Sequence, residues 1–242
     1  MDLGLAGKVA LVTASSRGLG RASAAALAAE GAAVVICGRN EDSVRQTESE
    51  LAGAGGDILG IVADVTQPDA PRRLAQAARE RFGRLDVLVA NAGGPPPGRS
   101  LDLTDEQLEA ALNNNLLTSI RLVRESLPSM RSAGWGRICL ITSFYIRQPS
   151  PTLALSNTAR TGLWAWAKTA AQDLFAEGIT LNLVCPGYHA TERIKGLSLP
   201  PDAPVGRPED FGRVVAFACS EPALFINGAA IQVDGGVVGS LS

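Results

Sequence analysis

The fold is decided by one stretch of the chain, Val12-Thr13-Ala14-Ser15-Ser16-Arg17-Gly18-Leu19-Gly20. It joins an apolar run, Lys8–Ala14, to a segment with helical spacing, Gly18–Glu30, so we expect it to turn a strand into a helix. Its small residues let the backbone approach a pyrophosphate, and the free N–H groups and dipole at the start of the helix attract negative charge. The stretch therefore predicts a dinucleotide-binding loop.

The same alternation of apolar runs and helical segments continues along the chain. The other runs are Ala33–Gly38, Ile58–Ala63, Leu85–Ala90, Arg137–Thr142, Ile179–Cys185 and Ala230–Val233. The other helical segments are Glu41–Leu51, Pro71–Phe82, Asp105–Arg131, Leu153–Ala176 and Pro208–Cys219. Strand–helix–strand repetition implies right-handed crossovers and a parallel sheet. The sequence predicts a single Rossmann-type, doubly wound α/β domain over residues 1–242, with seven parallel strands and helices on both faces.

The composition fits a globular enzyme. Of the 242 residues, 46% are hydrophobic and 19% are charged, and the formal net charge is −2, so we expect neither disorder nor a nucleic-acid or membrane partner. The four cysteines have no metal-ligand spacing, which predicts free buried thiols and no metal site. We see no signal peptide and no apolar stretch of ~20 residues, and we therefore expect a cytoplasmic protein.

The end of the second predicted strand, Cys37-Gly38-Arg39-Asn40, indicates which dinucleotide binds. A carboxylate at this place would accept hydrogen bonds from ribose hydroxyls and repel a 2′-phosphate, whereas a guanidinium can pair with that phosphate. The chain places Arg39 and Asn40 here and Arg17 in the phosphate loop. Two arginines converging on one anion favour NADP(H) over NAD(H). The alternative is that Arg39 is a solvated loop residue.

These motifs resemble those of the short-chain dehydrogenase/reductase family, and the resemblance covers almost the whole chain. Residues 13–20 are similar to that family's TGxxxGxG turn, with Ala14 in place of the first glycine. By resemblance, Asp64-Val65 contacts adenine, Asn91-Ala92-Gly93 lies near the cofactor, and Pro186-Gly187 with Thr191 holds the nicotinamide end. The expected cofactor-binding set is Thr13, Ser15, Ser16, Arg17, Gly18, Leu19, Gly20, Arg39, Asn40, Asp64, Val65, Asn91, Ala92, Gly93, Arg160, Pro186, Gly187 and Thr191.

The resemblance fails at the catalytic pair. In the family a tyrosine transfers the proton, a lysine binds the nicotinamide ribose, a serine orients the carbonyl and an asparagine supports a proton relay. Asn115 and Ser143 match the asparagine and the serine, but the YxxxK pair reads Ser156 and Arg160. Serine is a poor general acid at neutral pH because its pKa lies far above the ~10 of tyrosine. Arg160 keeps a positive charge that can bind ribose hydroxyls.

Other candidate proton donors lie beside the expected site. Both tyrosines of the chain are close to it in sequence, Tyr145 after Ser143 and Tyr188 after Pro186-Gly187. His189, the only histidine, follows Tyr188 and belongs to the residue type that titrates near neutral pH. We place Tyr145, Tyr188 and His189 in the substrate pocket. Tyr145 and His189 are candidate proton donors, with a pocket wall and a structural histidine as the respective alternatives.

Two further features follow from the resemblance. Residues 191–207 cover the place of the family's substrate lid, and such loops set specificity. The family also forms homo-oligomers, so we expect a dimer or tetramer in which the helices around Asn115 and Arg160 pack against partner subunits. Trp164 and Trp166 would then lie in the core or in an interface.

The sequence leaves three functions open. The first is an NADP(H)-dependent oxidoreductase acting on a small carbonyl, alcohol or imine, with a proton from Tyr145, His189 or bound water. The second keeps the pocket but performs an elimination, cyclisation or isomerisation, with Ser143 and Asn115 polarising a carbonyl. The third is a catalytically inactive dinucleotide-binding sensor or partner, because a fold does not fix a function.

Overall fold

The computed structural model describes residues 1–196 and 199–240. Their strands form one sheet in the order β3-β2-β1-β4-β5-β6-β7, and every neighbouring pair is parallel. The strands are β1 (Val9–Val12), β2 (Ala33–Gly38), β3 (Ile58–Val62), β4 (Val87–Ala90), β5 (Gly136–Ile141), β6 (Ile179–Pro186) and β7 (Ala230–Val233). This topology confirms the predicted seven-stranded parallel sheet.

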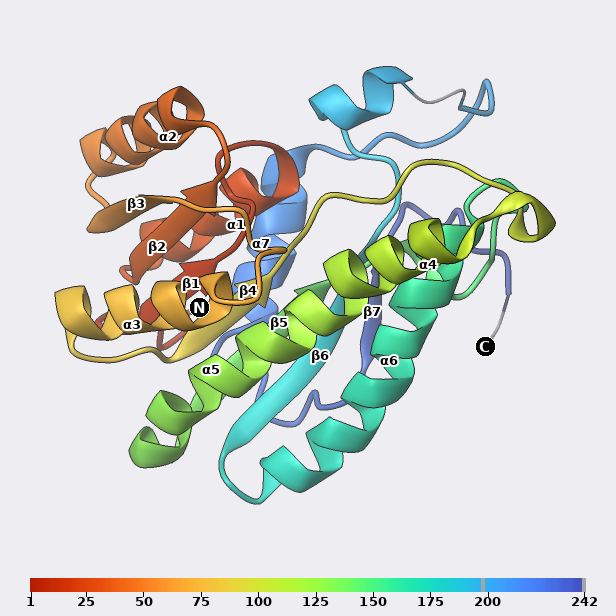
Figure 1. Ribbon diagram of the computed structural model, residues 1–242. Helices are drawn as coiled ribbons and strands as arrows, with labels where there is room; N and C mark the ends of the chain where they lie inside the picture. Colours follow the sequence, from red (N-terminus) through yellow and green to blue (C-terminus); the bar gives the residue numbers. More distant parts are fainter. Residues whose placement is uncertain (197–198, 241–242) are drawn as a thin grey trace.

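Helices cover both faces of the sheet (Figure 1). They are α1 (Gly18–Ala29), α2 (Glu41–Gly53), α3 (Ala70–Phe82), α4 (Asp105–Leu112), α5 (Thr118–Ala133), α6 (Ala154–Phe175) and α7 (Pro208–Ala218). On one face α3, α5 and α6 pack on Leu11 and its neighbours, and on the other α1, α2 and α7 pack on Val12 and its neighbours. Successive side chains of β1 thus point into opposite cores, as the two-residue period of a strand requires. The four cysteines are free and buried, which confirms the prediction of free buried thiols.

One predicted helix is not continuous. The segment Asp105–Arg131 was expected to be a single helix, but a π-helical turn, Asn113–Leu117, separates α4 from α5. The backbone N–H of Thr118 reaches back to the carbonyl of Asn113, and the Thr118 hydroxyl donates to the same oxygen at 2.8 Å. Turns of this kind concentrate at functional sites, and this one carries Asn115. The helix α4 begins at the predicted residue, Asp105, and a capping box between Thr104 and Gln107 closes its first turn.

Candidate active site

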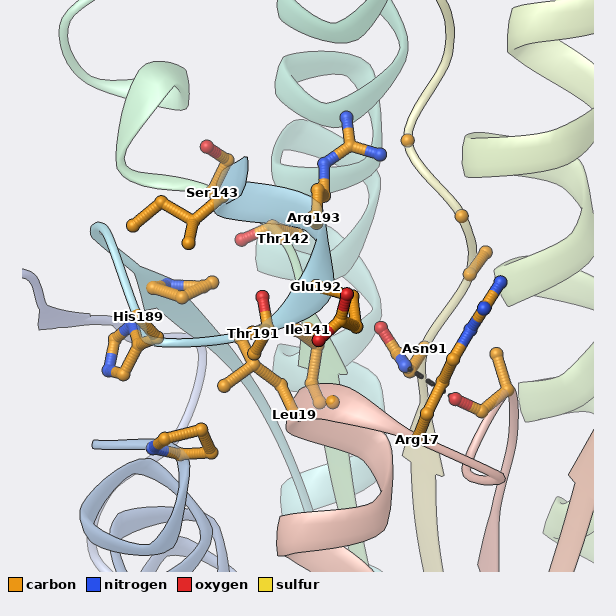
Figure 2. Close-up of a pocket in the computed structure, with 18 of the residues that line it drawn as sticks. Arg17, Leu19, Asn91, Ile141, Thr142, Ser143, His189, Thr191, Glu192 and Arg193 are labelled. Atoms are coloured by element: carbon orange, nitrogen blue, oxygen red, sulfur yellow. Dashed lines mark hydrogen bonds between the residues drawn. The ribbon is translucent and has the colours of Figure 1, made fainter. Parts of the chain in front are cut away.

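A cleft of about 1600 Å³ opens at the carboxyl edge of the sheet. It lies where the strand order reverses between β1 and β4, which is the usual ligand site of an open parallel sheet. Its walls come from segments far apart in sequence, including the β1–α1 loop, the loops after β2 and β4, the start of α6 and the loop after β6 (Figure 2). Most of the predicted site residues line this one cleft.

The phosphate loop is held in shape by residues behind the cleft. The Thr13 hydroxyl donates to the carbonyl of Asn91 at 2.7 Å and accepts from its backbone N–H at 2.9 Å, and the Asn91 amide donates to the carbonyl of Ala14 at 3.1 Å. The Ser15 hydroxyl donates to the carbonyl of Val12 and accepts from the N–H of Cys37. Thr13 and Ser15 were predicted to bind the cofactor, but the structure places them in these supporting contacts.

Two backbone positions explain the small residues of the loop. A Cβ on Gly20 would lie 2.5 Å from the carbonyl oxygen of Ala14 and 2.8 Å from the amide nitrogen of Asn91, so glycine is required there although Gly20 does not line the cleft. Ala14 has a φ of 45°, in the left-handed region. It stands where the family's turn has glycine, the residue best suited to this conformation. Ser16, Arg17, Gly18 and Leu19 line the cleft at the start of α1.

The two predicted arginines line the cleft together with the residues expected to contact adenine. Arg17, Arg39, Asn40, Asp64 and Val65 line it, and neither arginine lies within ion-pair distance of a carboxylate in the described part of the chain. Burial by itself would raise the pKa of Asp64, but hydrogen bonds from Thr66 and the charge of Arg39 hold it below its usual value. These residues therefore offer two exposed guanidinium groups without protein partners.

The opposite side of the cleft is built by the loop after β6. Pro186, Gly187 and Thr191 line it, facing Ala92 and Gly93 of the loop after β4. The turn depends on Gly187, because a Cβ there would lie 2.6 Å from the Cα of Asp234. Thr191 approaches the phosphate loop, and Figure 2 shows it beside Leu19 and Ile141. The loop thus reaches the amino end of α1.

The positions of the family's catalytic pair also face this cleft. Ser143 and Ser156 line it with Arg160, and the Ser156 hydroxyl makes no hydrogen bond within the described residues. The guanidinium of Arg160 donates to the carbonyl of Thr142 and, at 3.4 Å, to the side-chain oxygen of Asn115. Its Nε is buried and has no partner. Burial, followed by the charge of Arg193, lowers the pKa of Arg160 to about 10.

This cluster joins two of the predicted site residues, Asn115 and Arg160. Asn115 is buried behind the cleft and reaches it only through Arg160. Arg160 was expected to hydrogen-bond a ribose; in the structure each of its terminal nitrogens uses one N–H, donating to Thr142 and to Asn115. The π-helical turn is the element that presents Asn115 to Arg160, and nothing in the spacing of hydrophobic residues signalled it.

The two tyrosines lie together on the cleft wall. Their hydroxyls are 3.1 Å apart, and the ring of Phe144 packs against both. Burial, followed by the hydrogen bond to Tyr188, raises the pKa of Tyr145 above its ordinary value. Tyr145 therefore stays protonated at neutral pH, although the raised pKa makes its phenol a weaker acid than an ordinary tyrosine.

His189 lines the cleft but is fixed by its surroundings. It is 7% exposed, its Nδ1 lies 3.2 Å from the carbonyl of Gly187, and its ring meets Phe211 edge-on at 5.2 Å. Burial lowers the pKa of His189, against smaller opposing effects of Gly187 and Asp210. These contacts favour the structural alternative given for this residue.

Sequence reasoning missed Arg193 in the cleft. It lies on a short 3₁₀ turn, Glu192–Gly196, within the expected lid, and residues 197 and 198 of that lid are outside the described residues. Its guanidinium lies against the backbone of Gly94, because a Cβ added to Gly94 would be 2.9 Å from the Cζ of Arg193. A cation two residues after Thr191 was the only available signal, and an exposed lid would have explained it equally well.

Comparison with known proteins shows which family shares this sequence and architecture. The family described as enoyl-(acyl carrier protein) reductase matches residues 13–238. The human dehydrogenase/reductase SDR family member 4 is 33% identical over 244 residues, which cover 96% of this chain and 88% of the human protein. The 3-oxoacyl-[acyl-carrier-protein] reductase of Escherichia coli is 33% identical over 240 residues, which cover 96% and 97%. The chain belongs to the short-chain dehydrogenase/reductase family.

Solved structures agree with this membership. L-sorbose reductase from Gluconobacter frateurii, solved with NADPH and L-sorbose, superimposes with a TM-score of 0.93 at 29% identity over 100% of both chains. The short-chain dehydrogenase/reductase relatives named here are reductases, which supports the prediction of an oxidoreductase with a nicotinamide dinucleotide cofactor. Within residues 1–196 and 199–240, no helix is both long and apolar enough to cross a bilayer.

Proposed function

We propose that this protein is an NADP(H)-dependent oxidoreductase that reduces a small carbonyl compound or imine, or oxidises the corresponding alcohol or amine. The observation that carries the proposal is the lining of one cleft, which combines two unpaired arginines, Arg17 and Arg39, with a hydroxyl cluster made of Ser143, Tyr145, Ser156 and Tyr188. The similarity to an L-sorbose reductase solved with NADPH supports it. The preference for NADP(H) rests on Arg17 and Arg39.

The cleft fits a dinucleotide phosphate. Gly18 opens α1 with a φ of 60°, and the amino end of that helix faces the cleft, where its N–H groups and dipole favour a pyrophosphate. Arg17 and Arg39 would hold the 2′-phosphate, and Asp64 with Val65 the adenine. The loop with Pro186, Gly187 and Thr191 would hold the nicotinamide end. When bound, the cofactor supplies the hydride.

Reduction of a carbonyl also needs one proton, and Tyr145 is the proposed donor. Its raised pKa keeps the phenol protonated at neutral pH, so it can donate to the substrate oxygen as negative charge develops there. Tyr188, whose hydroxyl is 3.1 Å away, can pass a proton back to Tyr145. Ser143 and Ser156 would orient the substrate oxygen.

The test is NADPH consumption across a panel of small aldehydes, ketones and imines. We expect Tyr145→Phe to lower kcat at least a hundredfold while NADPH binding persists. Tyr188→Phe is the matched control, because it removes the neighbouring hydroxyl and leaves the proposed donor; we expect a smaller loss. Full activity of Tyr145→Phe would dismiss this residue as the donor.

One observation favours a second candidate. Ser156 and Arg160 stand where the family has its proton-transfer pair, and Arg160 is bound to Thr142 and Asn115. A dinucleotide-binding protein without hydride transfer, either a sensor or an enzyme of non-redox chemistry, would tolerate this arrangement. Tight NADPH binding with no consumption on the whole panel would support that candidate against the reductase.

We further propose a cytoplasmic homodimer or homotetramer. Four free thiols suit a reducing compartment. The half-buried Trp164 and Trp166 lie on α6, and Leu117 next to α5 is 41% exposed, which supports contact between copies through these helices. Light scattering after size exclusion tests this, and a monomer at micromolar concentration would refute it.

A further inference from the structure

Besides Arg17 and Arg39, two further guanidinium groups belong to residues that line the cleft. Arg160 comes from α6 and Arg193 from the turn after Thr191, and both line the cleft. They are close enough for the charge of Arg193 to lower the pKa of Arg160. Arg160 is partly buried and Arg193 is exposed, so solvent screens part of their repulsion, and an anion bound beside them would relieve the rest. The chain thus holds a local excess of positive charge.

The protein itself does not neutralise this charge. In residues 1–196 and 199–240, no carboxylate lies within ion-pair distance of Arg160 or Arg193. Glu192, the nearest acid in sequence, pairs with Lys195 at 2.6 Å instead. The Nε of Arg160 is buried without a hydrogen-bond partner. The unpaired guanidinium of Arg193 on the cleft wall, together with the uncompensated charge of Arg160, therefore points to a place that would bind an anion.

The direction of Arg193 separates this anion from the cofactor phosphates. Figure 2 shows its guanidinium pointing away from the phosphate loop, marked by Arg17 and Leu19, and toward the end of the cleft that holds Ser143. It rests against the backbone of Gly94, which has no side chain to push it back. This is the end that carries the hydroxyl cluster proposed to orient the substrate.

We propose that the substrate carries a carboxylate, as a small oxo acid does, and that Arg193 binds it while Arg160 adds positive charge. A guanidinium matches a carboxylate because two parallel N–H groups meet its two oxygens. The proposal names the substrate class of the proposed reductase and therefore rests on that proposed function. It makes Arg193 the residue that determines specificity in this site.

The test is a calorimetric titration with oxamate, a small carboxylate, and with oxamide, its neutral amide counterpart. Each is titrated into the protein with and without NADPH. We expect oxamate to bind at least about tenfold more tightly than oxamide, and we expect Arg193→Gln to abolish that preference while Arg193→Lys restores part of it. Lys195→Gln is the matched control, because it removes a cation from the same turn that pairs outside the cleft; it should keep the preference.

Several results would overturn the inference. Equal binding of oxamate and oxamide, binding of neither, or a preference that survives Arg193→Gln would each do so. If Arg193→Gln instead weakens NADPH at least about tenfold and leaves the oxamate preference intact, the residue serves the cofactor. A protein that binds oxamate through Arg193 but consumes no NADPH with any oxo acid supports the carboxylate site and refutes the reductase.

Discussion

The 2′-phosphate is the group that separates NADPH from NADH, and Arg39 is the residue whose removal tests how this chain recognises it. Arg39 lies at the rim of the cleft, exposed and without an ion-pair partner in the described chain. The charge of Arg39 reaches Asp64, whose pKa it helps to lower. We predict that Arg39→Gln weakens NADPH binding and leaves NADH binding nearly unchanged.

The size of the effect follows from the exposure of the site. A hydrogen bond to a charged group contributes about 1.5–3 kcal/mol, and solvent screening at an exposed position favours the lower end. A loss of about 1.4 kcal/mol is tenfold in an equilibrium constant. We therefore expect NADPH to bind about tenfold more weakly to Arg39→Gln, and NADH to change by less than about twofold because it lacks the phosphate.

The assay is fluorescence titration of both nucleotides at one fixed ionic strength, since salt screens the interaction. Arg45→Gln is the matched control: it removes the same charge from α2, where Arg45 pairs with Glu41 outside the cleft. Equal losses for NADPH and NADH would show that Arg39 serves a part common to both nucleotides. No loss for either would make it a solvated loop residue.

Three further predictions concern the framework of the site. Gly20→Ala would press a methyl group against Ala14 and Asn91 and should cost about 1–3 kcal/mol of unfolding free energy in urea denaturation, whereas Gly53→Ala, with open space around it, should cost nothing; equal stabilities would contradict the clash. Ala14→Gly should raise the unfolding free energy by about 0.5–1 kcal/mol, because the left-handed φ of 45° strains alanine more than the entropy of glycine costs; a lower melting temperature would refute this. Burial gives His189 a folded-state pKa below its unfolded value of 6.5, so the unfolded chain takes up the proton first as the pH falls. The free energy of unfolding that depends on neutral His189 is therefore fully present above pH 6.5 and declines below it. The melting temperature of the wild type should therefore fall more between pH 7.5 and pH 5 than that of His189→Asn, and parallel curves would dismiss the effect.

The fold could be predicted because each of its signals is local. The period of apolar residues marked every strand, and the stretch from Val12 to Gly20 marked the first crossover. The carboxyl ends of parallel strands meet at one edge of a sheet, so the sequence alone assigns loops 50 or more residues apart in the chain to one cleft. The π-helical turn at Asn113–Leu117 was not predicted, because one wider turn alters the spacing of apolar residues over only a few positions of a long helical segment.

The phosphate loop, Val12–Gly20, separates what the sequence determines from what the tertiary structure decides. The sequence by itself determined the sheet, the glycine turn and the set of polar residues near the cofactor, because periodicity and glycine placement are properties of short segments. Only the tertiary structure decided which of these residues face the cleft. It gave Thr13 and Ser15 supporting contacts behind the loop, joined Arg160 to Thr142 and Asn115, and put Arg193 on the same cleft wall as Arg160. Side-chain direction and charge balance depend on contacts between segments distant in sequence, which no local pattern contains.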